Sequence, residues 1–252
     1  MSSVMTTIGV TYDGMPVSFG GGVNSVAMLV RLIDDGWRGE IVFADTGCEW
    51  PETMCYMAYF ERYLAQHGLS VTKIAPTEHR SARSYAANLI DYCERLAVIP
   101  LLGMRWCTTH WKIEPLANYL GSDTYLVGIS ADEAHRQPGK VRPLVDWCVD
   151  RKGCIAIIEA AGLDVPQKSG CYICPSQKDS QWRALWERHP ELFERAARLE
   201  EMASEKHDKV ATLDPHGKVT LRQRQYAYEH QLTLPELDMD ELLAYRPCIC
   251  GV

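Results

Sequence analysis

The sequence lacks a hydrophobic run long enough to cross a membrane. Its longest apolar stretch, residues 96–104, is interrupted by Pro100, whereas a spanning helix needs about 18 or more consecutive apolar residues. The first seven residues, Met-Ser-Ser-Val-Met-Thr-Thr, have neither the basic stretch nor the apolar core of a secretion signal. These absences predict a protein without membrane association and with a cytoplasmic location.

An excess of positive charge is also missing. The 252 residues include 26 Lys and Arg against 33 Asp and Glu, which gives a net charge of −7. This argues against indiscriminate nucleic-acid binding, which needs a broad basic surface, although a local basic groove is compatible with it. The one compact basic cluster, Lys218, Arg222 and Arg224, either contacts a nucleotide 3′-phosphate or a polynucleotide, or is exposed solubilising charge.

The composition is that of a folded globular chain. Hydrophobic residues make up 46% and charged residues 23% of the sequence, which excludes a wholly disordered protein. The length fits one good-sized domain, and a chain of this size builds a core without disulfides. Neither internal repeats nor low-complexity segments are present.

Short apolar runs alternate with amphipathic stretches over the first 130 residues. We expect strands over 16–19, 41–44, 69–75 and 124–129, and helices ending before Gly36 and over 51–66, 84–96 and 109–120. This alternation predicts an α/β fold with a doubly wound, mostly parallel sheet. Ligands of such sheets bind at the carboxyl ends of the strands. The polar segments 20–25, 45–49 and 128–136 each follow a strand, so we expect them to meet at one edge.

The pattern changes after residue 148. We expect a helix over 150–161, a cysteine-bearing loop over 169–176, polar helices over 179–188 and 190–206, and a turn-rich end from residue 214. The sequence therefore predicts a nucleotide-binding α/β domain at 1–148. A helical subregion at 149–252 completes the metal and active site, within one structural unit.

A triple glycine separates the first expected strand from the first expected helix. Glycine lets the backbone approach phosphate oxygens closely, and the N–H groups of a helix N-terminus favour negative charge. The segment is neither a Walker A loop nor the dinucleotide-binding fingerprint. The alternative is an ordinary turn with a polar helix cap. The candidate phosphate-binding residues are Ser18, Gly20, Gly21, Gly22, Asn24 and Ser25.

A second polar loop, Asp45-Thr46-Gly47, follows the second expected strand. An acid at a strand end can orient a ribose or hold Mg²⁺. The alternative is a capping Asp before a turn. That alternative does not explain why two polar loops follow neighbouring strands, and we therefore include the segment in the candidate nucleotide site.

Four motifs, in this order, resemble the phosphoadenosine-phosphosulfate (PAPS) reductase family of the PP-loop, or adenine-nucleotide α-hydrolase-like, superfamily. They read Ser-Phe-Gly-Gly-Gly-x-Asn-Ser from residue 18, Asp-Thr-Gly-x-Glu-x-Pro-Glu-Thr from residue 45, Cys-Thr-Thr-His-Trp-Lys-Ile-Glu-Pro-Leu from residue 107 and Gly-Ile-Ser-Ala-Asp-Glu from residue 128. The match covers about residues 17–175. Two positions depart from the superfamily: Asn24 replaces the usual Asp of the pyrophosphatases, and Ser130 replaces an Arg common in the reductases.

The resemblance implies an adenine nucleotide with its phosphates on the glycine turn and residues 45–47 beside it. It also implies that Gly128 lies at the nucleotide and that Lys112, together with Arg105 and Arg136, supplies positive charge near the phosphates or the leaving group. For the two arginines the alternative is a solvated surface charge. Such fixed charges stabilise the negative charge that develops as a bond to phosphorus or sulfur breaks.

The ten cysteines contain one spacing that is typical of metal ligands. Cys171 and Cys174 form a Cys-x-x-Cys followed by Pro, which brings two thiolates within reach of one metal centre. The resemblance implies that Cys107 joins them on a 4Fe-4S cluster, with Cys248 or Cys250 as the fourth ligand or one iron left open. A structural zinc, with His110 or a C-terminal cysteine as fourth ligand, and the absence of any metal are the alternatives.

The C-terminal Cys250-Gly251 partly resembles the reductase tail whose cysteine attacks the sulfonucleotide sulfur. The resemblance therefore implies a PAPS-reductase-type enzyme of sulfur metabolism that reduces PAPS or its 3′-dephospho analogue APS to sulfite, with Cys250 and Lys112 as catalytic residues and a thioredoxin-like reductant as partner. One alternative is an ATP-dependent, pyrophosphate-releasing iron–sulfur sulfurtransferase acting on DNA or tRNA; another is a non-catalytic nucleotide-binding subunit. Mg²⁺ with the nucleotide and a homo-oligomer are left open.

Overall fold

The computed structural model describes residues 12–75, 86–136 and 139–232. Its centre is a parallel four-stranded sheet in the order β3-β2-β1-β4. The strands are β1 (Val17–Ser18), β2 (Ile41–Ala44), β3 (Val71–Ile74) and β4 (Leu126–Val127). The predicted α/β class and parallel sheet are confirmed. The strand 41–44 is confirmed in full, whereas the other three strands are shorter than predicted at both ends.

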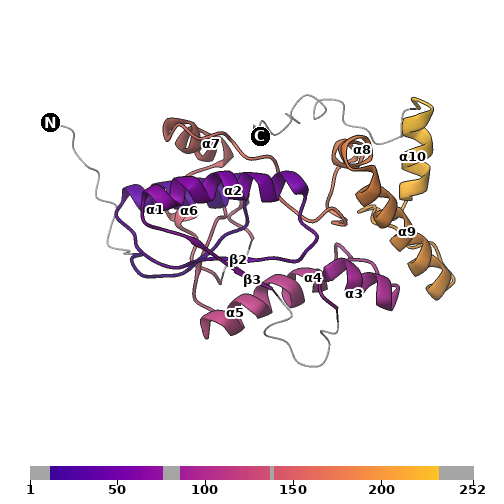
Figure 1. The fold of residues 1–252 in the computed structure, drawn as a ribbon, viewed down its shortest axis with the longest axis horizontal. Helices are drawn as coiled ribbons and strands as arrows, with labels where there is room; N and C mark the ends of the chain where they lie inside the picture. Colours follow the sequence, from indigo (N-terminus) through magenta and orange to yellow (C-terminus); the bar gives the residue numbers. More distant parts are fainter. Residues whose placement is uncertain (1–11, 76–85, 137–138, 233–252) are drawn as a thin grey trace.

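Helices cover both faces of the sheet (Figure 1). The helices α1 (Val23–Asp34) and α2 (Pro51–Gln66) lie on one face and α5 (Glu114–Leu120) lies on the other. Side chains of a strand alternate between faces. Accordingly, Ile41 and Phe43 of β2 join the core with α1 and α2, while Val42 packs with Leu116 of α5. The strand is buried on both sides, as its all-apolar sequence predicts.

The helix predicted at 109–120 begins earlier and is irregular. A short α4 (Trp106–Thr108) leads into a π-helical turn at Thr109–Ile113 and then into α5. The preceding helix α3 (Leu89–Leu96) starts where the Asn88 side chain accepts a hydrogen bond from the Asp91 N–H at 2.9 Å. The helix predicted at 84–96 thus starts later than expected: residues 86–88 are not helical, and residues 84 and 85 lie outside the described residues.

The remaining helices are α6 (Pro143–Asp146), α7 (Arg151–Ala160), α8 (Asp179–Arg188), α9 (Pro190–His207) and α10 (Leu221–Glu229). Asp150 caps α7 by accepting a hydrogen bond from the Gly153 N–H at 2.7 Å, as the sequence predicts. The predicted helices 179–188 and 190–206 are confirmed, the second with one more residue. Helix α10 lies in a stretch expected to consist of turns, so that expectation was wrong.

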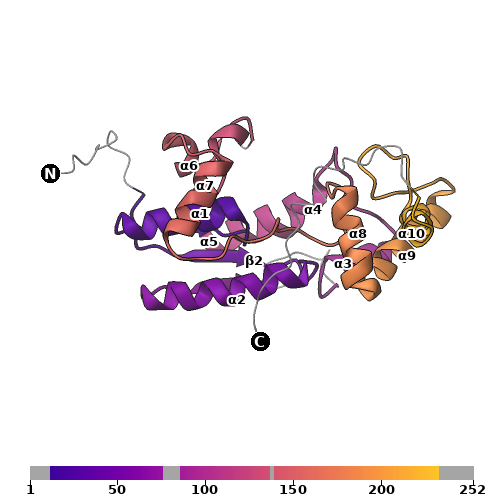
Figure 2. The ribbon, with the colours of Figure 1, turned by 90° about the horizontal axis from the view of Figure 1, so that it is seen from above.

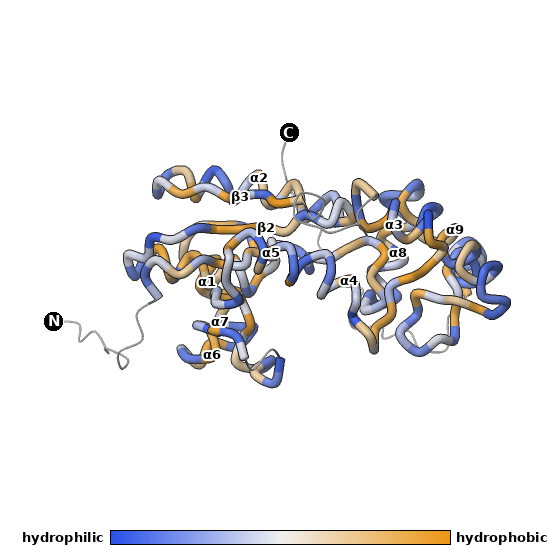
Figure 3. Tube along the Cα trace, turned by 90° about the horizontal axis from the view of Figure 1, so that it is seen from below, coloured by the Kyte–Doolittle hydropathy of each residue, from blue (hydrophilic) through white to orange (hydrophobic). Residues whose placement is uncertain are grey.

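Besides the small hydrophobic core between the sheet and α5, two larger cores hold the molecule together. One lies between the sheet and the helices α1, α2 and α7, where Cys154 and Ile158 of α7 are fully buried. The other lies among α3, α8, α9 and α10 around Trp111 and Trp182. These helices lie at one end of an elongated molecule, and the sheet lies toward the other end (Figure 2). Hydrophobic segments are present both in the strands and among these helices (Figure 3). The domains 1–148 and 149–252 stay a prediction; in packing, α7 belongs with the sheet.

The helices within the described ranges include none with the length and apolarity that crossing a membrane requires.

Candidate functional site

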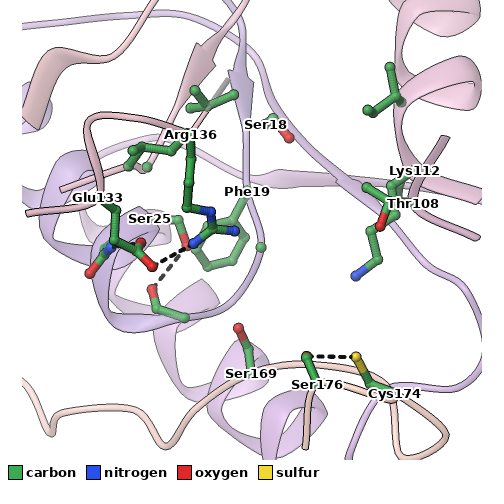
Figure 4. A pocket seen from close by; sticks show the side chains of 18 of the residues that line it. Ser18, Phe19, Ser25, Thr108, Lys112, Glu133, Arg136, Ser169, Cys174 and Ser176 are labelled. Atoms are coloured by element: carbon green, nitrogen blue, oxygen red, sulfur yellow. Dashed lines mark hydrogen bonds and ion pairs between the residues drawn. The ribbon is translucent and has the colours of Figure 1, made fainter. Parts of the chain in front are cut away.

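A cleft of about 830 Å³ opens at the carboxyl ends of β1 and β4. The chain leaves β1 toward β2 on one side and returns later to β4 on the other, and doubly wound sheets bind ligands at such a reversal point. The glycine turn after β1, the segment after β4, the helical segment with Lys112 and the loop with Cys174 form its walls (Figure 4). The predicted meeting of segments 20–25 and 128–136 is confirmed.

The predicted nucleotide-site residues divide into two groups. The cleft lining includes Ser18, Gly20, Gly22, Asn24, Ser25, Gly128 and Arg136. Gly21 and the segment 45–47 are not part of that lining. The Asp45 carboxylate accepts a hydrogen bond from the Gly47 N–H at 2.8 Å, as a turn-capping Asp does.

The glycine turn leaves the N-terminus of α1 open toward the cleft. Gly22 is the N-cap and provides no side chain for capping, and the N–H groups of a first helical turn have no intrahelical acceptors. Gly21 has a φ of +67° and packs on α2, where an added Cβ would lie 3.1 Å from Thr53 Cγ2. The turn therefore needs glycine for its backbone and offers N–H donors suited to an anion.

Gly128 brings the β4 loop against this helix start. A Cβ on residue 128 would lie 2.6 Å from both Cα and N of Ser25. This approach is too close for any side chain, so only glycine allows the two strand-end loops to meet.

Asn24 joins these loops through its side-chain amide. Its Nδ2 donates to Ser130 Oγ at 3.0 Å and to Glu133 Oε2 at 3.4 Å, and its Oδ1 accepts from Arg151 Nη1 at 3.0 Å. Glu133 Oε1 in turn accepts from Arg136 Nη1 at 2.6 Å. The two arginines are thus the ends of one continuous hydrogen-bonded chain. Arg151 was not predicted to belong to the site, because it belongs to α7, far along the sequence.

Charge is unevenly distributed over the cleft. Among the described residues that line it, two are acidic, Asp132 and Glu133, and five are basic. The basic residues are Arg105, Lys112, Arg136, Arg151 and Lys168. A positive cleft in a chain whose net charge is −7 favours an anionic ligand at this place.

The cleft also has an apolar part. It is lined by Phe43, Leu101, Leu102, Ile113, Leu116, Tyr125 and Val127. Phe43 and Leu116 are buried members of the cores on the two faces of the sheet, which makes this wall part of the fold's interior. An apolar wall beside a cationic one suits a ligand that has both a planar ring and phosphates.

Lys112, the predicted catalytic cation, lines the cleft and binds a buried carboxylate. Its Nζ lies 2.8 Å from Glu49 Oε1, and the Glu49 side chain is 2% exposed. Glu49 Oε1 also accepts from Thr46 Oγ1 at 3.2 Å, while Oε2 is buried without a partner. Burial by itself lowers the pKa of Lys112, but Glu49 and Cys171 raise it more, so the lysine stays charged. Glu49 belongs to the second motif, but its pairing with Lys112, 63 residues away, was not predicted.

Cys171 lies behind the cleft wall, beside this ion pair. Its Sγ is 3.3 Å from Thr46 Oγ1 and donates to Glu49 Oε1 at 3.7 Å. Burial raises the pKa of Cys171, and Glu49 raises it further, against the opposing effects of Lys112 and Thr46. The thiol is therefore held protonated at neutral pH.

Cys107 and Cys174 line the cleft itself. The Cys174 Sγ lies 3.0 Å from Ser176 Oγ (Figure 4). Burial raises the pKa of Cys107, and the influence of Cys174 raises it further. Cys174 acts on Cys171 in the same way. Two of the three predicted ligands, Cys107 and Cys174, thus line the cleft, whereas Cys171 lies behind its wall.

These thiols are not arranged as a complete metal centre. Within residues 12–75, 86–136 and 139–232, no three His, Cys, Asp or Glu side chains form a group that could hold a metal ion. The Nδ1 of His110, the alternative zinc ligand, faces the Glu114 carboxylate at 2.9 Å. Cys248 and Cys250 lie outside the described residues. The 4Fe-4S cluster and the zinc stay predictions, and the described side chains alone do not fit either.

The cysteine loop rests directly on the glycine turn. A Cβ on residue 22 would lie 2.5 Å from Ser169 Oγ. On the other side, the Gly170 carbonyl accepts from the Trp50 N–H at 3.1 Å, and the Tyr172 N–H donates to the Cys48 carbonyl at 2.8 Å. The loop that carries the Cys-x-x-Cys is therefore clamped between the phosphate turn and the segment that carries Glu49.

Comparisons with known proteins give distant relatives. No family model matches the chain. Two uncharacterized proteins of Methanocaldococcus jannaschii, MJ0973 and MJ0066, are 26% identical over 201 residues and 24% identical over 220 residues. These matches cover 70% and 76% of this chain but 45% and 42% of the relatives, so the chain spans less than half of their length.

Among solved structures, the chain is similar to a PAPS reductase from Candida auris in complex with phosphate. The TM-score is 0.44 and the identity 15%, and the match covers 66% of this chain and 84% of that one. Identities and scores of this size assign the chain to no family, so its function has to be inferred from the cleft.

Proposed function

We propose that the protein is an enzyme that binds an adenine nucleotide in this cleft and performs sulfur chemistry on it, of the PAPS-reductase type. One observation carries the proposal: the thiols of Cys107 and Cys174 line the same cleft as the glycine turn and Lys112. A phosphate on the turn would share one cleft with two thiols and a fixed cation.

The two parts of the cleft support a nucleotide rather than a simple anion. The apolar wall beside α5 suits an adenine ring, and the open N-terminus of α1 suits a phosphate. The excess of basic over acidic lining residues suits a ligand with more than one negative charge. We therefore propose PAPS or APS as the substrate class.

The proposed reaction is thiol-dependent reduction to sulfite. A cysteine thiolate, predicted to be Cys250, attacks the sulfonate sulfur; the bond from that sulfur to the phosphate oxygen breaks, and the adenosine phosphate leaves. A dithiol reductant then attacks the resulting S-sulfocysteine. Sulfite leaves with its electron pair, the enzyme thiol is restored, and the reductant is oxidised to a disulfide. Lys112 would stabilise negative charge on the leaving phosphate.

A sulfite-release assay tests this proposal. The full chain is incubated with PAPS or APS and a thioredoxin-type dithiol, and sulfite and adenosine phosphate are quantified. We expect equal amounts of the two products, loss of both in Cys250→Ser, and normal turnover in Cys55→Ser, because Cys55 is exposed on α2. Absence of sulfite with both substrates would refute the reductase.

A second candidate function is favoured by the position of the cysteines. Cys107, Cys171 and Cys174 belong to or adjoin the cleft wall, where a sulfur carrier would face an ATP-activated acceptor. This ATP-dependent sulfurtransferase would release pyrophosphate only in the presence of DNA or tRNA.

Metal analysis tests whether the protein holds an iron–sulfur cluster. Iron, acid-labile sulfide and zinc are measured in protein purified without oxygen. Iron together with sulfide supports a cluster, and one zinc refutes it. Nucleotide binding without either turnover would indicate a non-catalytic subunit.

A further inference from the structure

Arg151 reaches the glycine turn from a part of the fold that the strand-end motifs do not include. It is the first residue of α7, and the turn at 131–133 fixes the start of this helix at the cleft. The Ala131 N–H donates to the Val149 carbonyl at 2.8 Å, and the Arg151 N–H donates to Asp132 Oδ1 at 3.1 Å. The Arg151 guanidinium lines the cleft and donates to Asn24 Oδ1.

The side-chain hydrogen-bond partner of Arg151 is a neutral group, and the pKa of the nearby Asp132 carboxylate is lowered by a hydrogen bond from Ser130 and also by the charge of Arg151. Its side chain binds a neutral amide oxygen at 3.0 Å, and a guanidinium has five N–H donors, of which this bond uses one. The orientation of Asn24 is fixed by chemistry, since its Nδ2 faces the Glu133 carboxylate and only its oxygen can accept from an arginine. Asn24 therefore positions the guanidinium at the helix start without neutralising it.

The two acids that line the cleft are already bonded. Glu133 accepts from Arg136 and Asn24, and Asp132 accepts from the backbone N–H of Arg151. Oxygen ligands are what Mg²⁺ requires in proteins. Among the described residues that line the cleft, basic side chains outnumber carboxylates. Both carboxylates already bind arginines, so they are not arranged as Mg²⁺ ligands.

We propose that Arg151, together with Arg136, binds a second anionic group of the nucleotide beside the phosphate on the glycine turn, in place of a divalent cation. The ligand class is a nucleotide with two phosphate-like groups, bound without Mg²⁺. The inference rests on the proposed function for the adenosine part of the ligand, whereas the anion site itself depends only on the arginines and the helix start.

Calorimetric titration of the full chain in EDTA tests the proposal. The probes are AMP, ADP, adenosine 3′,5′-bisphosphate and inorganic pyrophosphate. In Arg151→Gln we expect binding of the two-phosphate nucleotides and of pyrophosphate to weaken by about tenfold or more, as loss of charge-assisted hydrogen bonds predicts. AMP should change by less than about twofold, because its one phosphate occupies the α1 N-terminus.

Two further variants make the result specific. Arg183→Gln removes an arginine that pairs with Glu187 on the surface of α8, and it should bind every probe as the wild type does. Asn24→Asp places a carboxylate opposite Arg151 and beside Glu133. It should weaken metal-free binding, and added Mg²⁺ should restore it. Asp150 and its bond to Gly153 are unchanged in all three variants, so α7 keeps its cap.

The outcomes separate the two proposals. Equal weakening of AMP and ADP by Arg151→Gln, or wild-type binding that is lost in EDTA, overturns the role of Arg151. Binding of pyrophosphate without any adenine nucleotide refutes the proposed function but supports the anion site. Failure of the wild type to bind any probe overturns both.

Discussion

The arginines of the cleft and those of the C-terminal helices have different partners. Arg224 on α10 is buried between Asp179 and Asp214, at 2.6 Å from the latter. Arg151 in the cleft instead binds the amide oxygen of Asn24. The charge of Arg224 is balanced by two buried carboxylates, whereas the hydrogen-bond acceptor of Arg151 is uncharged.

This difference bears on whether the compact basic cluster of the sequence is a ligand-binding site. The compact cluster Lys218, Arg222 and Arg224 was one candidate for a 3′-phosphate contact. In the structure, Arg222 pairs with Glu194 and Glu201, and Arg224 is buried. The side chains of Arg222 and Arg224 therefore have structural roles. To locate an anion site, the number of carboxylates around a basic residue is a better guide than the clustering of basic residues in the sequence.

Removal of Arg224 should have the largest effect of the changes considered. Arg224→Met leaves Asp179 and Asp214 buried without their cation, and we expect the free energy of unfolding to fall by about 3–5 kcal/mol. Urea unfolding measures this. Arg198→Met, at an exposed position of α9, should change it by no more than about 0.5 kcal/mol. A small effect of Arg224→Met would mean that the contrast with the cleft is wrong.

Glu200 gives the helical end of the molecule a pH dependence. Burial raises its pKa from 4.5 to about 7, although the N–H groups of Leu213 and Leu221 donate to its carboxylate at 2.6 Å each. Between these pKa values the native state binds more protons than the unfolded state. The free energy of unfolding should therefore fall as the pH rises from about 4.5 to 7, by at most about 3 kcal/mol.

Urea unfolding across that pH range checks the sign, and Glu200→Gln should remove the slope. Stability that rises over the same window in the wild type would contradict the assignment. Glu200 is a buried residue of α9, and no residue of that helix lines the cleft, so nucleotide binding by the folded protein should not follow this titration.

Gly128→Ala tests the cleft side of the comparison. The added Cβ would meet backbone atoms of Ser25 at 2.6 Å, and backbone cannot move aside as a flexible side chain can. We expect a loss of about 1–3 kcal/mol in stability together with loss of nucleotide binding in the molecules that remain folded. Gly103→Ala is the control, since an added Cβ there meets nothing within 4 Å. Normal nucleotide affinity in Gly128→Ala would remove the loop junction from the site.

The smallest expected effect concerns the reactivity of Cys171. Glu49→Gln removes a negative charge that raises the pKa of this thiol, so its thiolate fraction at pH 8 should increase and alkylation should become several-fold faster. Lys112→Met removes a charge that lowers the pKa, and should slow alkylation. Mass spectrometry of the peptide that contains Cys171 measures both rates. Changes in the same direction in both variants would contradict the electrostatic explanation.

Local signals allowed much of the fold to be predicted. Pro51 at the first helical position and the all-apolar run 41–44 fix α2 and β2 to the residue. Helix α10 was missed because one of its buried positions is the charged Arg224, which breaks the apolar pattern, although Thr220 and Gln223 form a capping box that indicates its start. The π-helical turn has no signal in residue spacing, since its apolar pattern also fits an α-helix.

The site could be predicted where it depends on adjacent residues and not where it depends on contacts across the chain. The glycine turn and the segment after β4 were recognised because each follows a strand. The pairing of Lys112 with Glu49 and of Asn24 with Arg151 links residues 63 and 127 positions apart. Such partners are set by how helices pack on the sheet, which composition and periodicity do not specify.

The close packing of Ser169 against Gly22 has a consequence for how the glycine turn and the cysteine loop influence each other. A larger side chain at residue 22 would displace Ser169, and so would an anion that shifts Ser169 on entering the turn. The backbone runs from Ser169 through Gly170 to Cys171, so the displacement would reach this cysteine. Occupancy of the turn and chemical modification of the thiols are then thermodynamically linked. Reciprocity requires that each alters the equilibrium of the other by the same factor. A reversible modification of Cys171, which is not part of the cleft lining, would then change the affinity of the turn for anions.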